Sequence, residues 1–189
     1  MTWQEYVQSA ERTANRGPED TFERRMTMCA LGLAGEGGEI PDEMKKALFH
    51  GHAFDRDAII KELGDVLWYV AIAASTAGID LSQLWNAPPQ QDAVDEAFVV
   101  KAAVNPALVL AFNATDAALA LVGFKDYMSL PEGVRGEIAN KLHPVLLMVG
   151  LLAKMLGSSL EAVAEANVAK LRKRYPDGFE AERSIHRVV

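Results

Sequence analysis

The chain has 189 residues, a net charge of −7 and an apolar fraction of 50%, which suits one domain with a substantial core. The negative charge argues against a nucleic-acid-binding protein, which normally presents a basic face. A nucleotide substrate stays compatible, because a metal ion can bridge acidic side chains and phosphates. Cys29 is the single cysteine, so the chain cannot form an internal disulfide, which suits a reducing cytosol. We interpret Cys29 as a packing residue rather than a nucleophile.

The N-terminal segment and the longest uncharged stretches both favour a cytoplasmic protein. Glu5 interrupts the first residues, and no apolar run of the signal-peptide type follows it. The uncharged stretches 66–79 and 102–115 are shorter than the roughly 20 residues that cross a bilayer. We therefore expect no membrane partner.

Helical signals begin at the N-terminus. Thr2 is expected to cap a first helix that ends near Asn15, and a long helical region follows over 21–49. Its segment 35–41 contains three glycines and a proline, which are poor helix residues. Two interpretations remain: a loop at this segment, or a bent helix whose bare backbone allows a partner to approach closely.

The next part of the chain predicts a central helix between two connections. Residues 50–56 form the first connection, and Asp55 is expected to cap a helix that runs to about Ala77. That helix is apolar on most sides, as is typical of a central helix of a bundle. Residues 78–81 then stop and restart the helix, and 86–91 is the clearest linker.

The remaining segments are also helical. Helices are expected over 92–103, 106–123 and 132–156, and a last one from Ser159 to Arg174. No alternating run of useful length predicts a sheet. The expected fold class is therefore all-α, a helical bundle in a single domain.

Two parts of the chain resemble each other. Residues 30–34 (ALGLA) are echoed at 107–111 (ALVLA), and residues 56–81 can be laid over 135–160. In this register, the acidic positions 36, 39, 62 and 65 correspond to Asn113, Asp116, Lys141 and Pro144. A degenerate internal repeat would complete the bundle without chemistry; an unrelated helical insertion is the alternative.

Two pairs of acids stand out by their spacing. Glu36 and Glu39 are three residues apart, as are Glu62 and Asp65, so each pair shares one helix face. If the two helices pack side by side, four carboxylates converge and repel one another unless a cation joins them. All-oxygen ligation favours Mg²⁺, with Mn²⁺ as a plausible substitute.

Other interpretations of these acids have to be weighed. An exposed acidic face is the usual explanation of such spacing, but these pairs lie among small and apolar residues, where charges normally have a counter-ion. Zinc is disfavoured, because His50 and His52 have no third Cys or His nearby. A di-iron bundle needs Glu-x-x-His pairs, which the two acidic pairs lack.

The last predicted helix carries a polar stripe. Asn167, Lys170 and Arg174 recur on one face and could hold a phosphate chain. The alternative is a solvated helix end, where basic residues are favoured by the helix dipole. Lys61, beside Glu62, is a further candidate for substrate binding, with an ordinary surface charge as the alternative.

Four segments together resemble MazG-like nucleotide pyrophosphohydrolases. They are GLAGEGGE (32–39), KKALFHGH (45–52), KELGDVLWYVA (61–71) and EANVAKLRKRYPDGF (165–179). The family motif, Glu-x-x-Glu followed by Glu-x-x-Asp, falls on the two acidic pairs. The chain departs from the family at Gly35, where some members have a further Glu, and at 86–158, a segment that relatives usually lack.

The resemblance implies a fold of the all-alpha NTP pyrophosphatase type within the single domain 1–189. Residues 20–85 would be the catalytic helical pair, 86–158 the insertion and 159–180 a tail helix that completes the site. A homodimer is the usual state of relatives; a monomer is the alternative if the insertion replaces a subunit contact.

The implied reaction is Mg²⁺-dependent hydrolysis of a nucleoside triphosphate to the monophosphate and pyrophosphate. Glu36, Glu39, Glu62 and Asp65 would hold the metal, and Glu39 would also help to deprotonate water. The tail residues would bind phosphate, and Trp68 could stack on a base or simply be a core aromatic. The insertion and Gly35 motivate an alternative, a non-catalytic nucleotide-binding or interaction module.

Overall fold

A computed structural model describes residues 1–189 with the exception of 15–16, 18, 86–95, 123–130 and 186–189. The described residues form helices and no strand, which confirms the all-α prediction. The helices are α1 (Trp3–Thr13), α2 (Phe22–Phe49), α3 (Arg56–Thr76), α4 (Leu81–Leu84), α5 (Glu96–Leu121), α6 (Glu132–Met155), α7 (Leu160–Arg174) and α8 (Ala181–Ile185).

The glycine-rich segment 35–41 is helical. α2 continues through it and through Pro41 without a break, so the loop interpretation is wrong. Thr21 caps the start of α2 by accepting a hydrogen bond from the Arg24 N–H. A continuous α2 keeps Glu36 and Glu39 on one helical surface.

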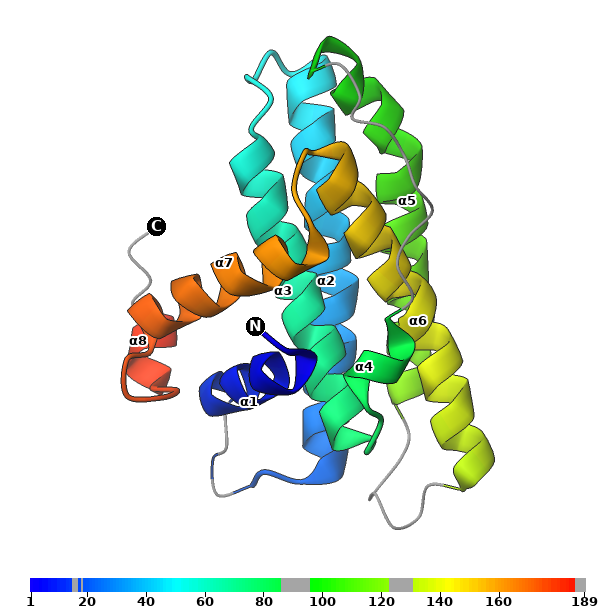
Figure 1. The fold of residues 1–189 in the computed structure, drawn as a ribbon, viewed down its shortest axis with the longest axis vertical. Helices are drawn as coiled ribbons and strands as arrows, with labels where there is room; N and C mark the ends of the chain where they lie inside the picture. Colours follow the sequence, from blue (N-terminus) through cyan, green and yellow to red (C-terminus); the bar gives the residue numbers. More distant parts are fainter. Residues whose placement is uncertain (15–16, 18, 86–95, 123–130, 186–189) are drawn as a thin grey trace.

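Four long helices form the bundle, with α2 and α3 as one antiparallel pair and α5 and α6 as the other (Figure 1). α5 packs along α2, α6 contacts both α5 and α3, and α7 crosses α3. One contiguous core of buried aliphatic side chains joins these helices. The described part of the segment 86–158, helices α5 and α6, therefore lies against α2 and α3 of the same chain and contributes half of the bundle.

Two boundary predictions were incomplete. Separate helices over 92–103 and 106–123 were expected, but α5 runs through Pro106 as one helix. Proline removes one helical hydrogen bond, yet Ala103, Ala107 and Leu110 are buried on both sides of it, so packing keeps the two halves in line. α8 was not predicted, and the linker 86–91 lies outside the described residues.

α3 and α6 end in the same kind of turn. Gly78 and Gly157 have φ angles of 66° and 69°, the left-handed region that glycine adopts without strain. The N–H of Ile79 donates to the Ala74 carbonyl, and that of Ser158 donates to the Ala153 carbonyl, each at 2.8 Å. These turns coincide in the proposed repeat register.

α2 and α5 come into close contact at a pair of residues that corresponds in the repeat register. A Cβ added at Gly37 would lie 2.8 Å from the Cβ of Ala114. Equivalent residues meet in this way at the axis of a two-fold arrangement. The internal duplication stays a prediction, with this contact and the matching turns in its favour.

By length and composition, two helical stretches could cross a membrane: Val99–Leu121 and Gly133–Met155. The apolar windows in them are one third and one half buried inside the protein. This differs from the expectation drawn from uncharged stretches alone, because a few charged residues do not abolish the apolar character of a helix. Core helices of bundles pass the same test, so the finding does not place the chain in a membrane.

The Gly37 contact gives a first testable prediction. Gly37→Leu is expected to destabilise the fold by about 1–3 kcal/mol, because its side chain would be forced between α2 and α5. Gly38→Leu is the matched control: a Cβ there meets nothing within 4 Å, so the better helix former should be neutral or stabilising. Urea denaturation of both variants measures the difference, and equal stabilities would contradict this packing.

Candidate metal centre

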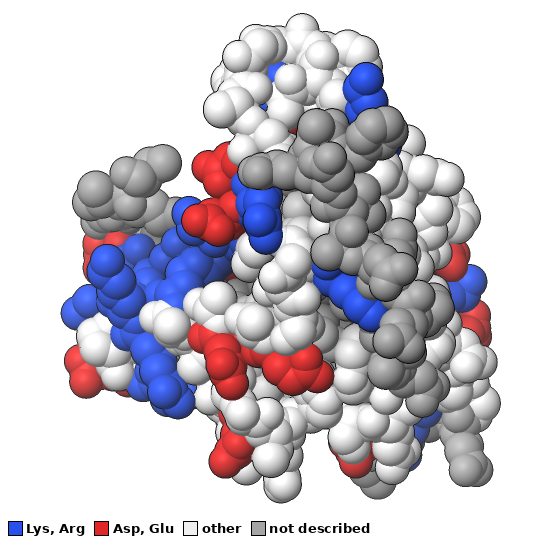
Figure 2. Space-filling model, turned by 45° about the horizontal axis from the view of Figure 1, so that its top comes forward, with Lys and Arg blue, Asp and Glu red and all other residues white. Residues whose placement is uncertain are grey.

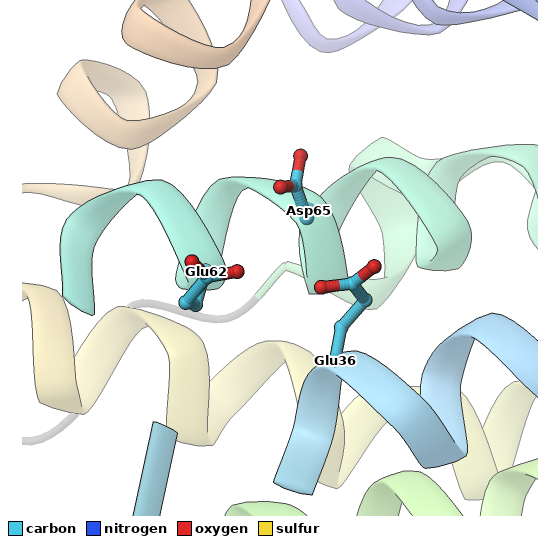
Figure 3. A group of neighbouring side chains, drawn as sticks. All are labelled: Glu36, Glu62 and Asp65. Atoms are coloured by element: carbon cyan, nitrogen blue, oxygen red, sulfur yellow. The ribbon is translucent and has the colours of Figure 1, made fainter. Parts of the chain in front are cut away.

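Three carboxylates converge where α2 and α3 lie side by side. Glu36 comes from α2, and Glu62 and Asp65 come from α3 (Figure 3). One oxygen of each lies within 4.8 Å of the others, and all three side chains are half-buried. The i, i+3 spacing on α3 and the antiparallel packing of α2 therefore bring together the acids that the sequence singled out.

Glu39, the fourth predicted ligand, does not belong to this group. Its side chain is exposed one helical turn beyond Glu36, although it lines the same cleft as the other three. The structure thus gathers three of the four predicted metal ligands within chelating distance and leaves Glu39 at the edge of the site.

The electrostatics of the cluster favour a bound proton or a cation. Burial raises the pKa of Glu36 to about 7, and the nearby charges of Asp65, Glu62 and Glu39 add to the effect. Burial also raises the pKa of Glu62, again with a contribution from Asp65. A cluster in which like charges are crowded and partly desolvated is stabilised by any positive charge placed among them.

Lys170 of α7 supplies one positive charge to the cluster. Its ammonium group donates to both carboxylate oxygens of Asp65, at 2.6 Å for Oδ2. Asn167, one turn earlier on α7, donates from Nδ2 to Asp65 Oδ1 at 3.1 Å. α7 therefore brings a cation and an amide to the acids from outside the α2–α3 pair.

Asn167 lies inside the protein rather than on the wall of the cleft. Its side chain is almost fully buried, its Oδ1 accepts a hydrogen bond from the Tyr6 hydroxyl at 3.3 Å, and its Nδ2 is used on Asp65. A Cβ at Gly64 would lie 3.1 Å from the Asn167 Cβ, so the absence of a side chain at Gly64 allows α7 to pack closely against α3. The predicted phosphate contact is thus not the role its polar atoms have in this structure, where Asn167 positions Asp65.

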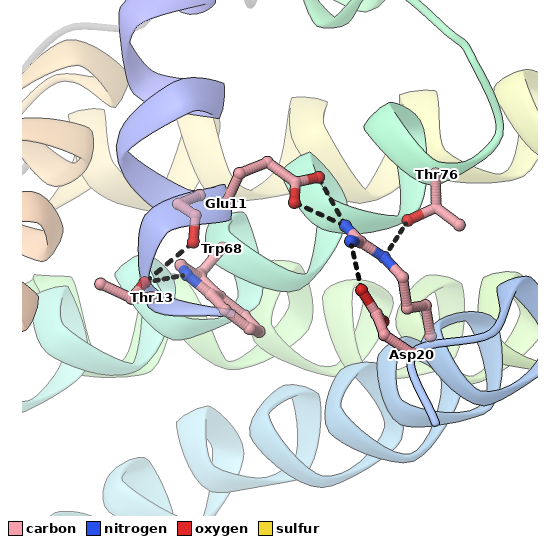
Figure 4. Close-up of polar contacts among 7 residues, drawn as sticks. Glu11, Thr13, Asp20, Trp68 and Thr76 are labelled. Carbon is pink, nitrogen blue, oxygen red and sulfur yellow. Dashed lines mark hydrogen bonds and ion pairs between the residues drawn. The ribbon is translucent and has the colours of Figure 1, made fainter. Parts of the chain in front are cut away.

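A cleft of about 660 Å³ surrounds the acids. Its walls include five further residues that the sequence had proposed for substrate binding or chemistry: Glu39, Lys61, Trp68, Lys170 and Arg174. The Trp68 indole N–H donates to the Thr13 hydroxyl at 3.0 Å (Figure 4). The Trp68 ring meets the Tyr69 ring edge-on, at 4.9 Å between centroids. Figure 2 shows Lys and Arg side chains gathered at the end of α7, where Arg172, Lys173 and Arg174 follow one another.

The chemistry of the donors fits a hard divalent ion. All three ligand groups are carboxylates, which Mg²⁺ and Mn²⁺ prefer. Among the described residues, no His or Cys joins a potential metal group, and His50 and His52 are exposed in the connection after α2. Cys29 is fully buried, and burial raises the pKa of its thiol to about 12, which suits a packing residue.

Two supporting residues were not identified from the sequence. Tyr6 is buried beneath the site and contacts Asn167, 161 residues away along the chain. Tyr69 lines the cleft and rests against α2 at Gly32, where an added Cβ would overlap its ring. Both depend on how separate helices meet, and no local spacing signals that.

Comparison with known proteins identifies the same part of the chain. Residues 24–87 match the family model of the MazG nucleotide pyrophosphohydrolase domain. This segment is MazG-like. The matched part of the chain contains α2, α3 and all four motif acids, whereas α5, α6 and the α7 residues around Asp65 lie beyond it.

A curated relative matches a similar length of chain. The "Gene 37 protein" of Mycobacterium phage L5 is 39% identical over 61 residues, which cover 30% of this chain and 54% of that protein. The chain thus spans about half the length of the curated relative it matches. No solved structure matches the chain.

Proposed function

We propose that the protein hydrolyses a nucleoside triphosphate, an NTP or dNTP, to the nucleoside monophosphate and pyrophosphate in the presence of Mg²⁺. The observation that carries the proposal is the meeting of Glu36, Glu62 and Asp65 within 4.8 Å of one another inside a MazG-like segment. Nucleotide phosphates and clustered carboxylates share an affinity for Mg²⁺, which reconciles an acidic site with an acidic substrate.

The side chains around the cleft would have three roles: metal binding, proton acceptance and phosphate binding. Glu36, Glu62 and Asp65 would hold the metal, which when bound polarises a phosphoryl group and lowers the pKa of water. The exposed carboxylate of Glu39 would accept a proton from the attacking water. Lys170 and Arg174, on the α7 wall, would contact the oxygens of the leaving pyrophosphate.

Asp65 connects the carboxylate cluster with the polar residues of α7. It is within chelating distance of Glu36 and Glu62, and it also receives Lys170 and Asn167. A buried Asn167 fixes the direction of the Asp65 carboxylate, because hydrogen bonds to a ligand group restrict its rotation. The Tyr6 hydroxyl in turn holds Asn167.

The test is a panel of the common NTPs and dNTPs with Mg²⁺, in which pyrophosphate and the monophosphate are both measured. At least one nucleotide is expected to give the two products in equal amounts, and EDTA is expected to stop the reaction. Nucleotide binding by calorimetry without any product under Mg²⁺ or Mn²⁺ would contradict hydrolysis and favour the non-catalytic nucleotide-binding module.

Lys170 gives a more local prediction. Lys170→Met is expected to lower kcat/KM by about 10- to 100-fold, because a charge-assisted contact to phosphate is lost. The matched control is Lys173→Met, which removes an exposed charge from the same helix outside the cleft. Steady-state kinetics on the preferred nucleotide measure both, and equal effects of the two substitutions would contradict a specific role of Lys170.

A further inference from the structure

A second hollow, of about 1120 Å³, opens beside the metal cleft along the first half of α2. Its walls include Met28, Leu31, Gly32 and Gly35 of α2, and Tyr69 of α3. We propose that this side pocket receives the nucleoside part of the substrate while the phosphates occupy the metal cleft. The inference rests on the proposed function and adds to it the direction in which the substrate lies.

The side pocket and the metal cleft are neighbours with a common border. Met28, Glu36 and Tyr69 line both of them. A molecule whose phosphate is held at Glu36 can therefore extend into the side pocket. Its volume of about 1120 Å³ slightly exceeds the roughly 300–1,000 Å³ that is typical of a site for a small organic molecule, so a nucleoside has room in it.

The side chains of the cleft and of the side pocket differ in charge, so the phosphates and the nucleoside of a nucleotide favour different sites. Lys170 and Arg174 line the cleft and not the side pocket. The side pocket has two guanidinium groups, and both are paired: Arg25 lies 2.6 Å from Glu11 and 3.5 Å from Asp20, and Arg24 lies 3.3 Å from Glu19. Figure 4 shows Glu11, Asp20 and Thr76 around the Arg25 guanidinium.

Acidic residues outnumber these arginines in the side pocket, since Glu19, Asp20 and Glu23 line it together with Glu36. A polyphosphate chain would be repelled there, whereas a neutral base and sugar would not. The leaving pyrophosphate thus belongs on the α7 side.

The apolar surface of the side pocket suits a planar base. Leu31 is 72% exposed although it is a large aliphatic residue, and it projects into this space. Tyr69 offers an aromatic ring at the border with the cleft. Its place is fixed by Gly32, where a Cβ would overlap the ring, and by the edge-on contact with Trp68. Aromatic rings and exposed aliphatic groups bind bases through stacking and apolar contact.

Gly35 provides a way to fill the pocket without disturbing the protein. A Cβ at Gly35 meets nothing within 4 Å, and the residue lines the side pocket. Gly38 is equally open on the same helix but lines neither space. Gly35→Phe and Gly38→Phe therefore form a matched pair that differs in whether the new ring enters the pocket.

The experiment measures binding by calorimetry in the presence of Mg²⁺. The probes are the α,β-methylene analogues of the common NTPs and dNTPs, which are not cleaved between the α and β phosphates, and inorganic tripolyphosphate, which has no nucleoside. Gly35→Phe is expected to weaken the best analogue by about tenfold or more while changing tripolyphosphate affinity less than about twofold. Gly38→Phe is expected to change neither.

Leu31→Asn is a second variant for the case that Gly35→Phe perturbs α2. Because Leu31 is mostly exposed, the fold should tolerate the change, and a loss confined to the nucleotide analogue is again expected. Unchanged analogue affinity in both variants would overturn the pocket assignment, as would equal weakening of analogue and tripolyphosphate. A wild-type protein that binds tripolyphosphate but no nucleotide analogue, or neither probe, would overturn the proposed function itself.

Discussion

Asp65→Asn is expected to abolish nucleotide hydrolysis, with a loss of at least about 10²- to 10⁴-fold in kcat. The substitution keeps the size of the side chain and removes one anionic oxygen from the Glu36–Glu62–Asp65 group. It also removes the charge that Lys170 contacts. Metal binding and the placement of the α7 cation therefore fail together, which is why this single change has the largest expected effect on activity.

Single-turnover release of pyrophosphate is the appropriate measurement, with circular dichroism to verify that the helices are intact. Asp57→Asn is the matched control, because Asp57 is an exposed acid on the first turn of the same helix and outside the cleft. Its activity should remain within about twofold of wild type. Full activity of Asp65→Asn would show that the reaction, if present, takes place elsewhere.

Glu36→Gln is expected to stabilise the metal-free protein at pH 8 while abolishing its response to Mg²⁺. In the fold, burial and the neighbouring acids raise the pKa of Glu36 to about 7, above the 4.5 of an ordinary glutamate. At pH 8 the carboxylate is charged in both states, and the folded state bears the cost of crowding that charge. Glutamine removes this cost, which we place on the order of 2 kcal/mol after allowing for solvent screening.

The pH dependence has a definite sign. Well below pH 4.5, Glu36 is protonated in both the folded and the unfolded chain, so it costs nothing. As the pH rises toward 7, the unfolded chain ionises first, and the folded protein loses stability across this window. In the metal-free state, the advantage of Glu36→Gln over wild type should therefore be small at pH 4.5 and reach its maximum above pH 7.

Thermal unfolding with EDTA or Mg²⁺ measures both effects. For a chain of this length, 2 kcal/mol corresponds to a rise of about 4–8 °C in Tm for metal-free Glu36→Gln at pH 8. Mg²⁺ at 100 times its Kd should stabilise the wild type by about 2.7 kcal/mol and the variant hardly at all. A variant that is less stable than wild type in EDTA, or that responds normally to Mg²⁺, would contradict the role assigned to Glu36.

The parts of the fold that the sequence predicted well are those set by local rules. Thr2, Asp55 and Ser159 cap α1, α3 and α7, because a side-chain oxygen at these positions reaches the free N–H groups of the first turn. The acidic pairs were likewise visible, because i and i+3 share a face wherever a helix forms. The length of α5 was not, since only burial on both sides of Pro106 carries the helix through the proline.

The finer structure of the site depends on contacts between distant segments. Asn167 had the spacing of a phosphate ligand, but the packing of α1 and α7 on α3 places it between Tyr6 and Asp65. Glu39 had the same local pattern as Glu62, yet only one member of the α2 pair reaches the cluster. Side-chain reach across two helices is set by their distance and rotation, which a single sequence does not encode in its spacing.

In the α5–α6 pair, the positions that correspond to the metal-site acids in the repeat register do not form an acid cluster. Asp116 and Lys141, which fall on Glu39 and Glu62 in the repeat register, form an ion pair at 2.8 Å. An ammonium group there neutralises its neighbouring carboxylate directly, so this pair of positions has no need of a metal. This contact fits a structural role of the α5–α6 pair in the bundle.

We expect Glu36, Glu62 and Asp65 to hold one shared divalent ion. Crystals grown with Mn²⁺ and measured at a wavelength where manganese scatters anomalously would show this ion. We expect an anomalous peak bounded by oxygens of these three side chains, with Mn–O distances of about 2.2 Å, and none in crystals of Asp65→Asn. Crystals at millimolar Mn²⁺ in which the three carboxylates carry no such peak would contradict the account.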